Sequence, residues 1–432
     1  MPSVTVPAIL STPQSIAFYG GLTPSEVRHA YGFDRLSFNG VAGDGRGQTI
    51  AIVTADNDPT IAGDLATFDR EFGLVAPPSF TKVALPGATA ISPLWSLETA
   101  LDVEWAHAIA PGAKLLLIEA PSGNLGDLLS AADYARQQPG VSVVSMSWGS
   151  AEISVETALD GFFTTPANHA GVAFVAASGD GGSAGALWPA LSPNVLAVGG
   201  TQLTVDPLGD YVAESAWSGS AGGTSRYESA PAAQAALTGN AMRTGPDVSY
   251  NAATGFAVYT SVTINGYTGW MTTGGTSAGA PQWAALLAIA DQGRALAGKA
   301  NLTDAVSAID SLPASDFHDV TTGGNGAVKA GPGYDEITGR GSPYADRVVS
   351  GLVGPTTAAS PPPANSVSGT APPATTGLDR NLLANRFANF VQKTTGKATP
   401  AVRLPSGDAT FLGATISAVD VLRALEDSTR RR

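Results

Sequence analysis

Between residues 48 and 198 the chain alternates short apolar runs with longer stretches whose apolar residues recur every three or four positions. The short runs predict strands buried on both faces, and the longer stretches predict helices. Strands that alternate with helices are typical of a parallel sheet covered by helices on both faces. We expect strands at 48–53, 114–118, 141–145, 172–176 and 194–198, and helices at 24–31, 64–72, 96–109, 125–137 and 155–169.

The pattern changes after residue 200. Residues 201–270 are rich in Thr, Ser, Tyr and Gly and predict further strands, whereas the apolar run at 283–290 predicts a buried helix. A loop-rich segment at 311–343 leads to a last helix at 343–352. Pro, Ala, Ser and Thr dominate 354–376, which is typical of an extended linker. We therefore divide the chain into a large domain over 1–353, a linker over 354–377 and a small appended module of unknown role over 378–432.

Composition narrows the class of protein. The 432 residues include 36 acidic and 23 basic side chains, a net charge of −13 that argues against a nucleic-acid partner. Few positive charges would remain to repel one another in acid, which is typical of a protein that works there. The absence of cysteine excludes disulfides and thiol catalysis. No apolar run reaches the roughly 18 residues of a membrane-spanning helix, and the first ten residues do not have the pattern of a signal peptide.

A glycine-rich stretch directly before the apolar helix is the strongest candidate for chemistry. Residues 272–281 read Thr-Thr-Gly-Gly-Thr-Ser-Ala-Gly-Ala-Pro and place Ser277 at the start of that helix. Backbone amides at a helix start can stabilise negative charge on a reacting oxygen, so Ser277 is a candidate nucleophile. The alternative is that Ser277 simply caps the helix. Pro281 is expected in the first turn, where no backbone donor is needed.

Carboxyl groups in two other segments could act with such a serine. Glu98 and Asp102 are four residues apart on a predicted helix, so both project from one face. Apolar neighbours favour a desolvated pair that shares a proton, although a solvated acidic face is the ordinary alternative. Asp180 follows a buried strand and lies in a glycine loop, where a simple turn is the alternative.

Two further segments suit binding. Ser147, Trp148 and Gly149 end a predicted strand and could offer backbone hydrogen bonds to an extended peptide. Asp319-Val320 and the later Gly331-Pro-Gly333-Tyr-Asp335 combine two carboxylates with glycine carbonyls, which suits a hard cation such as calcium.

In this order the segments resemble the sedolisins, the serine-carboxyl peptidases built on a subtilisin-like fold. The resemblance covers residues 20–350. It is carried by Glu98-Thr-Ala-Leu-Asp102 with Ala110-Pro-Gly-Ala113, by Ser178-Gly179-Asp180, by Gly275-Thr276-Ser277-Ala-Gly-Ala-Pro281, and by Asp319-Val320 with Gly331-x-Gly333-x-Asp335. The fold class it implies is α/β, a subtilisin-like, mostly parallel sheet with helices on both faces, here with the small C-terminal module added.

The resemblance also implies a function, the acid-active endopeptidase cleavage of peptides or unfolded proteins. Ser277 would be the nucleophile, Glu98 the general base, Asp102 its orienting partner, and Asp180, kept protonated, an oxyanion donor. Ser147, Trp148 and Gly149 would bind the substrate backbone. One structural calcium ion would be held by the carboxylates of Asp319 and Asp335 and the carbonyls of Val320, Gly331 and Gly333. We expect a secreted monomer.

Some features depart from the family pattern. This chain shows no large amino-terminal pro-segment, Gly181 stands where the family often has Ser, and Thr54 stands where some members have an acidic residue. Three alternatives stay open: a catalytically inactive binding protein on the same fold, a tripeptidyl-type exopeptidase of the same family, and a neutral-pH hydrolase with a histidine base. The four histidines, none in a His-Gly-Thr-like setting, disfavour the last: His29, His107, His169 and His318.

Overall fold

The computed structural model describes residues 21–354. The first twenty residues, the predicted linker from residue 355 and the predicted module at 378–432 lie outside the described residues.

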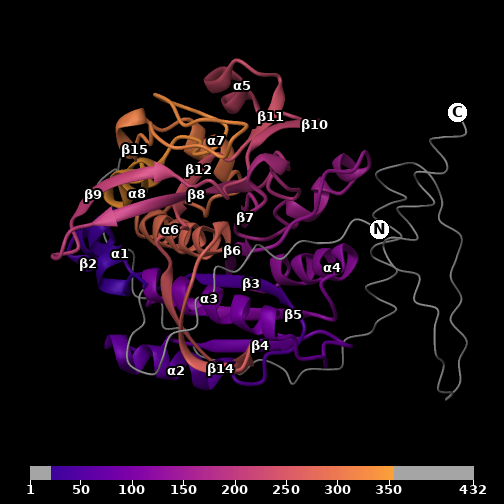
Figure 1. The fold of residues 1–432 in the computed structure, drawn as a ribbon, viewed down its shortest axis with the longest axis vertical. Coiled ribbons are helices and arrows are strands. Elements are labelled where there is room, and N and C mark those ends of the chain that lie inside the picture. Colours follow the sequence, from indigo (N-terminus) through magenta and orange to yellow (C-terminus); the bar gives the residue numbers. More distant parts are fainter. Residues whose placement is uncertain (1–20, 355–432) are drawn as a thin grey trace, which may run out of the picture.

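The predicted parallel sheet is confirmed and is the centre of the fold (Figure 1). Seven strands pair in parallel in the order β12-β8-β7-β6-β3-β5-β4, and β9 adds to β8 in the antiparallel direction. Their bounds are β3 Thr49–Ala55, β4 Phe80–Ala84, β5 Lys114–Ala120, β6 Val141–Met146, β7 Ala173–Ala177, β8 Leu196–Val205, β9 Tyr211–Ala216 and β12 Val248–Asn251.

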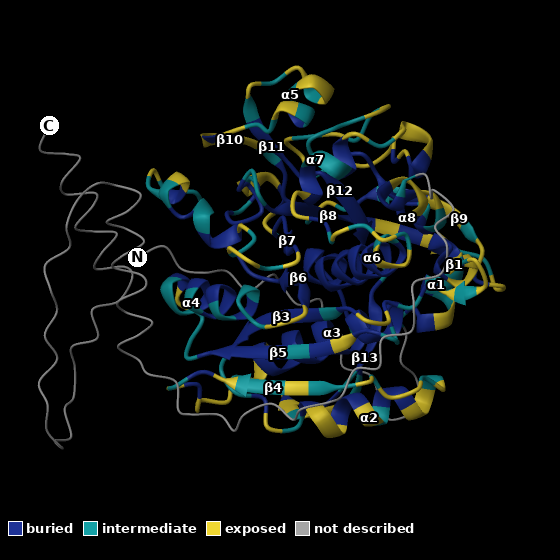
Figure 2. Cartoon of the chain, turned by 180° about the vertical axis from the view of Figure 1, so that it is seen from behind, coloured by how far each residue is buried: buried dark blue, intermediate teal, exposed yellow. Residues whose placement is uncertain are grey.

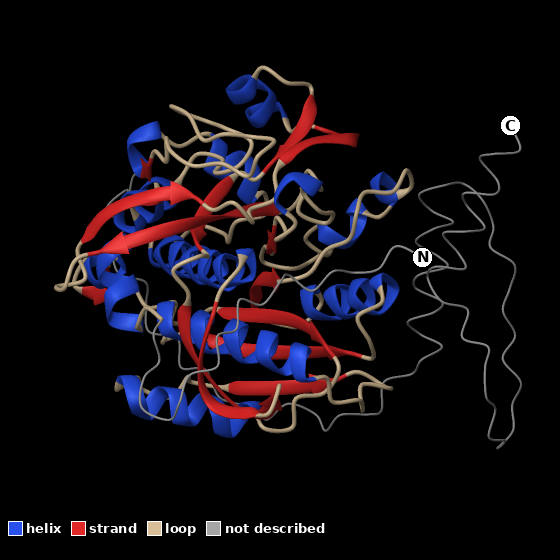
Figure 3. Ribbon diagram, viewed as in Figure 1, coloured by secondary structure: helices blue, strands red, loops and turns tan. Residues whose placement is uncertain are grey.

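Helices cover both faces of the sheet, as the alternating pattern predicts (Figure 3). On one face α3 (Pro93–Ile109) packs beside α6 (Thr276–Leu296), and the hairpin of β13 (Phe256–Ile264) and β14 (Tyr267–Thr273) packs with α2 (Ile61–Phe72) over α3. On the other face lies α4 (Leu125–Arg136). Both α3 and α6 are interior helices (Figure 2): fifteen of the 17 residues of α3 are buried. Carboxylates on α3 are therefore not solvated.

The remaining elements are short. The helices are α1 Pro24–Tyr31, α5 Ala232–Thr238, α7 Ala305–Asp310 and α8 Ala345–Val353. Two-stranded pairs join β1 Ser37–Phe38 to β2 Val41–Ala42, β10 Gly223–Ser229 to β11 Met242–Gly245, and β15 Phe317–His318 to β16 Ser342–Pro343. Single 3₁₀ turns are η1 Phe33–Arg35, η2 Glu156–Ala158, η3 Asp160–Phe163, η4 Gly182–Ala184 and η5 Ala314–Asp316.

The helix predicted at 155–169 is wrong. The segment forms only the turns η2 and η3. Gly161 and Pro166 weaken a helix there. Phe163 instead packs edge-on against Phe174 of β7 and against Trp188. Tertiary packing of one aromatic residue thus outweighs the apolar periodicity of the segment.

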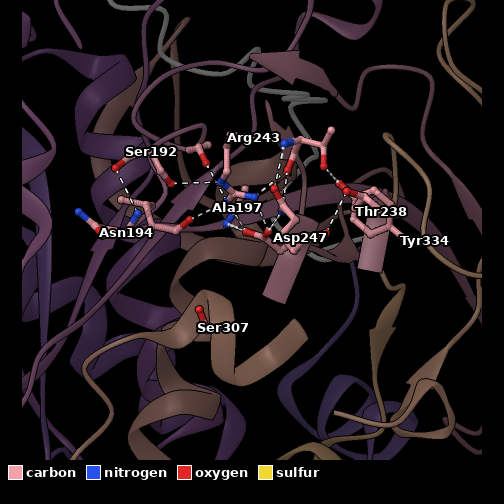
Figure 4. A network of polar contacts seen from close by, with 12 residues as sticks. Ser192, Asn194, Ala197, Thr238, Arg243, Asp247, Ser307 and Tyr334 are labelled. Carbon is pink, nitrogen blue, oxygen red and sulfur yellow. Dashed lines mark hydrogen bonds and ion pairs between the residues drawn. The ribbon is translucent and has the colours of Figure 1, made fainter. Parts of the chain in front are cut away.

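A buried ion pair between Arg243 and Asp247 connects β11, the residue before β12, and β8 (Figure 4). The Arg243 guanidinium donates to both Asp247 oxygens, at 2.5 and 2.6 Å, and neither side chain is exposed. The Gln234 amide and the Ala197 backbone N–H also donate to Asp247, at 2.8 and 2.7 Å. With its charges paired and its oxygens saturated, this cluster meets the conditions under which a buried pair is tolerated.

Candidate active site

The predicted catalytic segments meet at the carboxyl edge of the sheet. Ser147 directly follows β6, and Asp180 lies three residues beyond the end of β7. Carboxyl ends of neighbouring parallel strands share one edge, where open α/β sheets bind their ligands. The packed pair α3 and α6 brings Glu98, Asp102 and Ser277 to the same place.

The start of α6 shows that Ser277 does not cap the helix. The cap residue is Gly275 and the helix begins at Thr276, so Ser277 is its second residue. Gly275 has a φ of 110°, in the left-handed region, and a Cβ there would lie 2.3 Å from Asp180 Oδ2. Glycine is therefore required at this position by both the backbone angle and the carboxyl beside it.

Pro281 is not in the first turn, contrary to the sequence-based expectation, but is the sixth residue of α6. An α-helical amide normally donates to the carbonyl four residues earlier. Because proline has no N–H, the carbonyl of Ser277 loses its helical donor. The Ser147 hydroxyl takes that place, with its oxygen 3.2 Å from the Ser277 carbonyl oxygen.

Glu98 and Asp102 form a desolvated pair on adjacent turns of α3, with 1% and 0% exposure. Burial raises the pKa of Glu98 well above its ordinary value, and the charge of Asp102 raises it further. Burial likewise raises the pKa of Asp102, against the opposing effect of a hydrogen bond from Ser147. Such a pair shares a proton rather than carrying two charges.

Each of the four predicted catalytic side chains has one buried oxygen without a hydrogen-bond partner. These atoms are Glu98 Oε1, Asp102 Oδ2, Asp180 Oδ2 and Ser277 Oγ. Ser277 nevertheless lies beside Glu98, because its hydroxyl is one of the groups that lower the pKa of Glu98 by favouring the charged form of that carboxyl. Buried polar groups are usually paired, so unpaired ones gathered in one place mark a site prepared for a ligand or a reaction.

The two oxygens of Asp180 have different surroundings. Oδ1 accepts hydrogen bonds from the Thr276 backbone N–H at 2.8 Å and the Thr276 hydroxyl at 2.7 Å. Oδ2 is buried and unpaired. Burial raises the pKa of Asp180 to about 7, so in acid the group is neutral with its proton available on Oδ2. A neutral carboxyl can donate a hydrogen bond, which is what an oxyanion requires.

In the segment 147–149, the side chains of Ser147 and Trp148 make hydrogen bonds inside the protein. The Ser147 hydroxyl donates to Asp102 Oδ1 at 2.8 Å, a contact that the sequence did not reveal. The Trp148 indole is buried and donates to the Val53 carbonyl at 3.1 Å. Any contact between a peptide and this segment would therefore come from the backbone, including that of Gly149.

Two further polar residues of α3, Glu104 and His107, belong to the core. Glu104 accepts a hydrogen bond from the Tyr259 backbone N–H at 3.1 Å. His107 lies 3.3 Å from Asp69 and contacts the Val75 carbonyl at 3.0 Å.

The residues predicted to hold calcium come together in one loop. Both Asp319 oxygens accept from the Gly333 N–H at 3.1 Å, and Asp335 Oδ2 accepts from the Gly331 N–H at 2.9 Å. Val320 is buried beside them. The two carboxylates bring the oxygen ligands that a hard cation prefers into the segments that also contain Val320, Gly331 and Gly333. No cluster of three or more His, Cys, Asp or Glu side chains in residues 21–354 could hold a metal.

Comparison with known proteins agrees with the α/β fold. Residues 97–307 match the family model described as Subtilase family. Kumamolisin from Bacillus sp. (strain MN-32) is 36% identical over 376 residues, 77% of this chain and 63% of kumamolisin. Sedolisin from Pseudomonas sp. (strain 101) is 34% identical over 257 residues, 52% of this chain and 43% of that protein. The chain thus spans less than two thirds of the length of either relative.

A solved structure gives the same result. Pseudomonas sedolisin, described as a serine-carboxyl proteinase complexed with two molecules of pseudo-iodotyrostatin, superimposes with a TM-score of 0.66. It is 29% identical and covers 77% of this chain and 98% of its own. The fold is therefore that of the subtilisin-like peptidases. Within that class, the chain belongs to the sedolisin family.

Proposed function

We propose that the chain is an acid-active serine-type endopeptidase. The observation that carries this proposal is the convergence of Ser277, Glu98, Asp102 and Asp180, each with an unpaired buried oxygen, at the carboxyl edge of the sheet. Family membership supports the same chemistry. The substrates would be peptides or unfolded proteins.

The proposed reaction proceeds through an acyl-enzyme. Ser277 Oγ attacks the peptide carbonyl while its proton passes to Glu98, and the protonated Asp180 and the Ser277 amide donate to the oxyanion. Glu98 then gives the proton to the leaving amine as the C–N bond breaks. Water attacks the resulting ester, with Glu98 again as the base, and restores Ser277. Asp102 holds Glu98 and shares its proton.

The pH range of activity follows from the opposite protonation states that the reaction requires of Glu98 and Asp180. Glu98 acts as a base only when the Glu98–Asp102 pair has lost a proton, which sets the acidic limit. Asp180 donates only while protonated, and its pKa of about 7 sets the upper limit. Activity is therefore confined to acid, where a carboxylate base is well matched.

The test is a pH–rate profile from pH 2 to 8 on denatured protein, with variants and matched controls. Ser277→Ala and Glu98→Gln should abolish hydrolysis. Ser249→Ala removes another buried, unpaired serine hydroxyl, and Glu104→Gln alters another buried carboxyl on α3; both should retain the wild-type profile. Activity that peaks at neutral pH, or that survives Glu98→Gln, would overturn the proposal.

Peptides blocked at both ends separate endopeptidase from tripeptidyl-type exopeptidase action. An endopeptidase cleaves them, whereas an exopeptidase of the same mechanism requires a free amino terminus. Absence of hydrolysis in all assays, together with tight binding of peptide, would instead support an inactive binding protein on this fold.

We further propose one structural calcium ion at the loop of Asp319 and Asp335, with the carbonyls of Val320, Gly331 and Gly333. The adjoining Tyr334 hydroxyl donates to Thr244 Oγ1 at 2.9 Å, so this loop is coupled to β11. An ion there would stabilise the fold and would supply no acid or base. Chelation should lower the melting temperature of the wild type, and Asp335→Asn should remove that calcium dependence. A melting temperature unaffected by calcium would contradict the proposal.

We propose that the enzyme is secreted, because an acidic environment favours this chemistry. We also propose that it is a monomer. Within the part of the chain that the structure describes, no helix has the length and apolar character needed to cross a bilayer.

A further inference from the structure

Ser147 connects the acidic pair to the helix that carries the nucleophile. Its hydroxyl oxygen lies 2.8 Å from Asp102 Oδ1 and 3.2 Å from the carbonyl oxygen of Ser277. The residue is fully buried. A serine hydroxyl has one hydrogen, so it cannot donate fully to both oxygens at once.

The competition between these two acceptors arises from Pro281. With an ordinary residue at 281, the Ser277 carbonyl would accept the helical N–H and would not need Ser147. Proline removes that donor, so the carbonyl is left to the Ser147 hydroxyl. The other oxygen of Asp102, Oδ2, has no partner, so within residues 21–354 Ser147 is the one hydrogen-bond donor to Asp102.

We infer that Ser147 is a positioning residue whose hydroxyl turns between Asp102 Oδ1 and the Ser277 carbonyl as Asp102 loses and gains a proton. This inference rests on the proposed function. When Asp102 is charged, the Ser147 O–H donates to Oδ1. When Oδ1 is protonated, that carboxyl donates to Ser147 Oγ, and the Ser147 hydrogen turns to the Ser277 carbonyl. The proton is exchanged with Glu98 or with a hydronium ion, so one O–H bond breaks there as the O–H of Asp102 forms, and the reverse occurs when Asp102 loses its proton.

Electrostatics supports this arrangement. The Ser147 hydroxyl lowers the pKa of both Asp102 and Glu98, against the larger effect of burial. Asp180 is the other ionisable group whose charge acts on Glu98, and it too raises the Glu98 pKa. No basic side chain is among the groups that shift the pKa of Glu98 or Asp102. The Ser147 hydroxyl therefore supplies a substantial part of the stabilisation of a negative charge on this pair.

The first measurement compares Ser147→Ala with wild type in kcat/KM against pH. Loss of a hydrogen bond to a charged group should lower kcat/KM by about 10-fold to 100-fold. The acidic limb of the profile should move up by about one pH unit, because the charged form of the pair loses its donor. Ser147→Thr retains a hydroxyl, so its acidic limb should lie at the same pH as that of the wild type. Ser142→Ala removes another buried serine hydroxyl, on β6, and is the control for a merely structural effect.

Pro281→Ala gives a variant with the opposite expectation. It returns an amide donor to the Ser277 carbonyl, so the Ser147 hydroxyl can commit to Asp102. The acidic limb should then move down rather than up, and adding Ser147→Ala should reverse that movement.

A second readout does not depend on activity. The ¹³Cγ resonance of Asp102, assigned by its absence in Asp102→Asn, should titrate at higher pH in Ser147→Ala than in wild type. An unchanged titration in the folded variant would overturn the role of Ser147, even if the enzyme is active. A wild type that hydrolyses nothing would contradict the proposed function, while this titration would still decide the inference.

Discussion

Glu156 provides the sharpest test of how buried carboxyls govern stability. It lies in η2, fully buried, and its Oε2 accepts a hydrogen bond from the Ile153 N–H at 2.7 Å. Its Oε1 has no partner. Burial, with the nearby charges of Glu152 and Asp160, raises the pKa of Glu156 from 4.5 to about 8. The perturbation we consider is Glu156→Gln, which resembles the protonated side chain in shape.

The sign of the effect follows from proton linkage. Because the folded-state pKa is above the unfolded value, folding is favoured below about pH 4.5 and loses stability as the pH rises toward 8. At about 1.4 kcal/mol per pH unit the full difference would be ~5 kcal/mol. Solvent screening and proton sharing with neighbouring carboxyls reduce this, and we expect about 2–3 kcal/mol. Glu156→Gln removes this loss, so it should stabilise the fold at pH 8 and have little effect at pH 4.

Denaturant unfolding of the wild type and the variant at pH 4 and pH 8 measures the change in the free energy of unfolding at each pH. Glu71→Gln removes one negative charge from the exposed face of α2 and is the matched control; it should show no comparable gain at pH 8. A Glu156→Gln protein that is no more stable than wild type at pH 8 would contradict a destabilising charge on Glu156. An equal gain at both pH values would also refute the reasoning, since titration would not be the cause.

Three further predictions concern the site and the core. Asp180→Asn keeps a donor that does not titrate, so the alkaline limb near pH 7 should disappear, with the maximum rate reduced about tenfold. Gly275→Ala would place a Cβ 2.3 Å from Asp180 Oδ2 and should lower kcat/KM about 100-fold in a protein that still folds, as circular dichroism would show. Arg243→Met leaves Asp247 charged and buried and should lower the free energy of unfolding by about 3–5 kcal/mol, whereas the double change with Asp247→Leu should lower it less.

Much of the fold was predictable because the buried strands are short, apolar and regularly spaced. The parallel sheet, its helices on both faces and the helix carrying Glu98 and Asp102 follow from that pattern. The spacing of this pair was informative because helix geometry fixes the relation of residues four apart. The segment 155–169 was not predictable in the same way, because Phe163 makes contacts with residues distant in sequence.

The contacts of the site that join distant segments were also beyond the sequence. Ser147 and Asp102 are 45 positions apart, and Ser147 and Ser277 are 130 apart. A serine before Trp-Gly gives no local sign that its hydroxyl faces a carboxylate. Pro281 could have been a clue, since a proline beyond the first turn of a helix leaves the carbonyl four residues earlier without its amide. The start of the helix was needed to know that Pro281 lies beyond that turn and that the Ser277 carbonyl is affected.

Activity and stability should fail at different points as the pH rises. Asp180 has a pKa of about 7, Glu156 of about 8 and Glu228 of about 9, each raised mainly by burial. Asp180, the proposed oxyanion donor, should therefore lose its proton before Glu156 and Glu228 do. Near pH 7–8 the protein should be inactive yet folded, and return to acid should restore activity at once. At higher pH the charges of Glu156 and Glu228 accumulate in the same acidic cluster, with Asp160 between them, and recovery should then require refolding. Far-UV circular dichroism and activity measured along one pH titration would separate the two transitions, and their coincidence would show that the site and the cluster do not titrate independently.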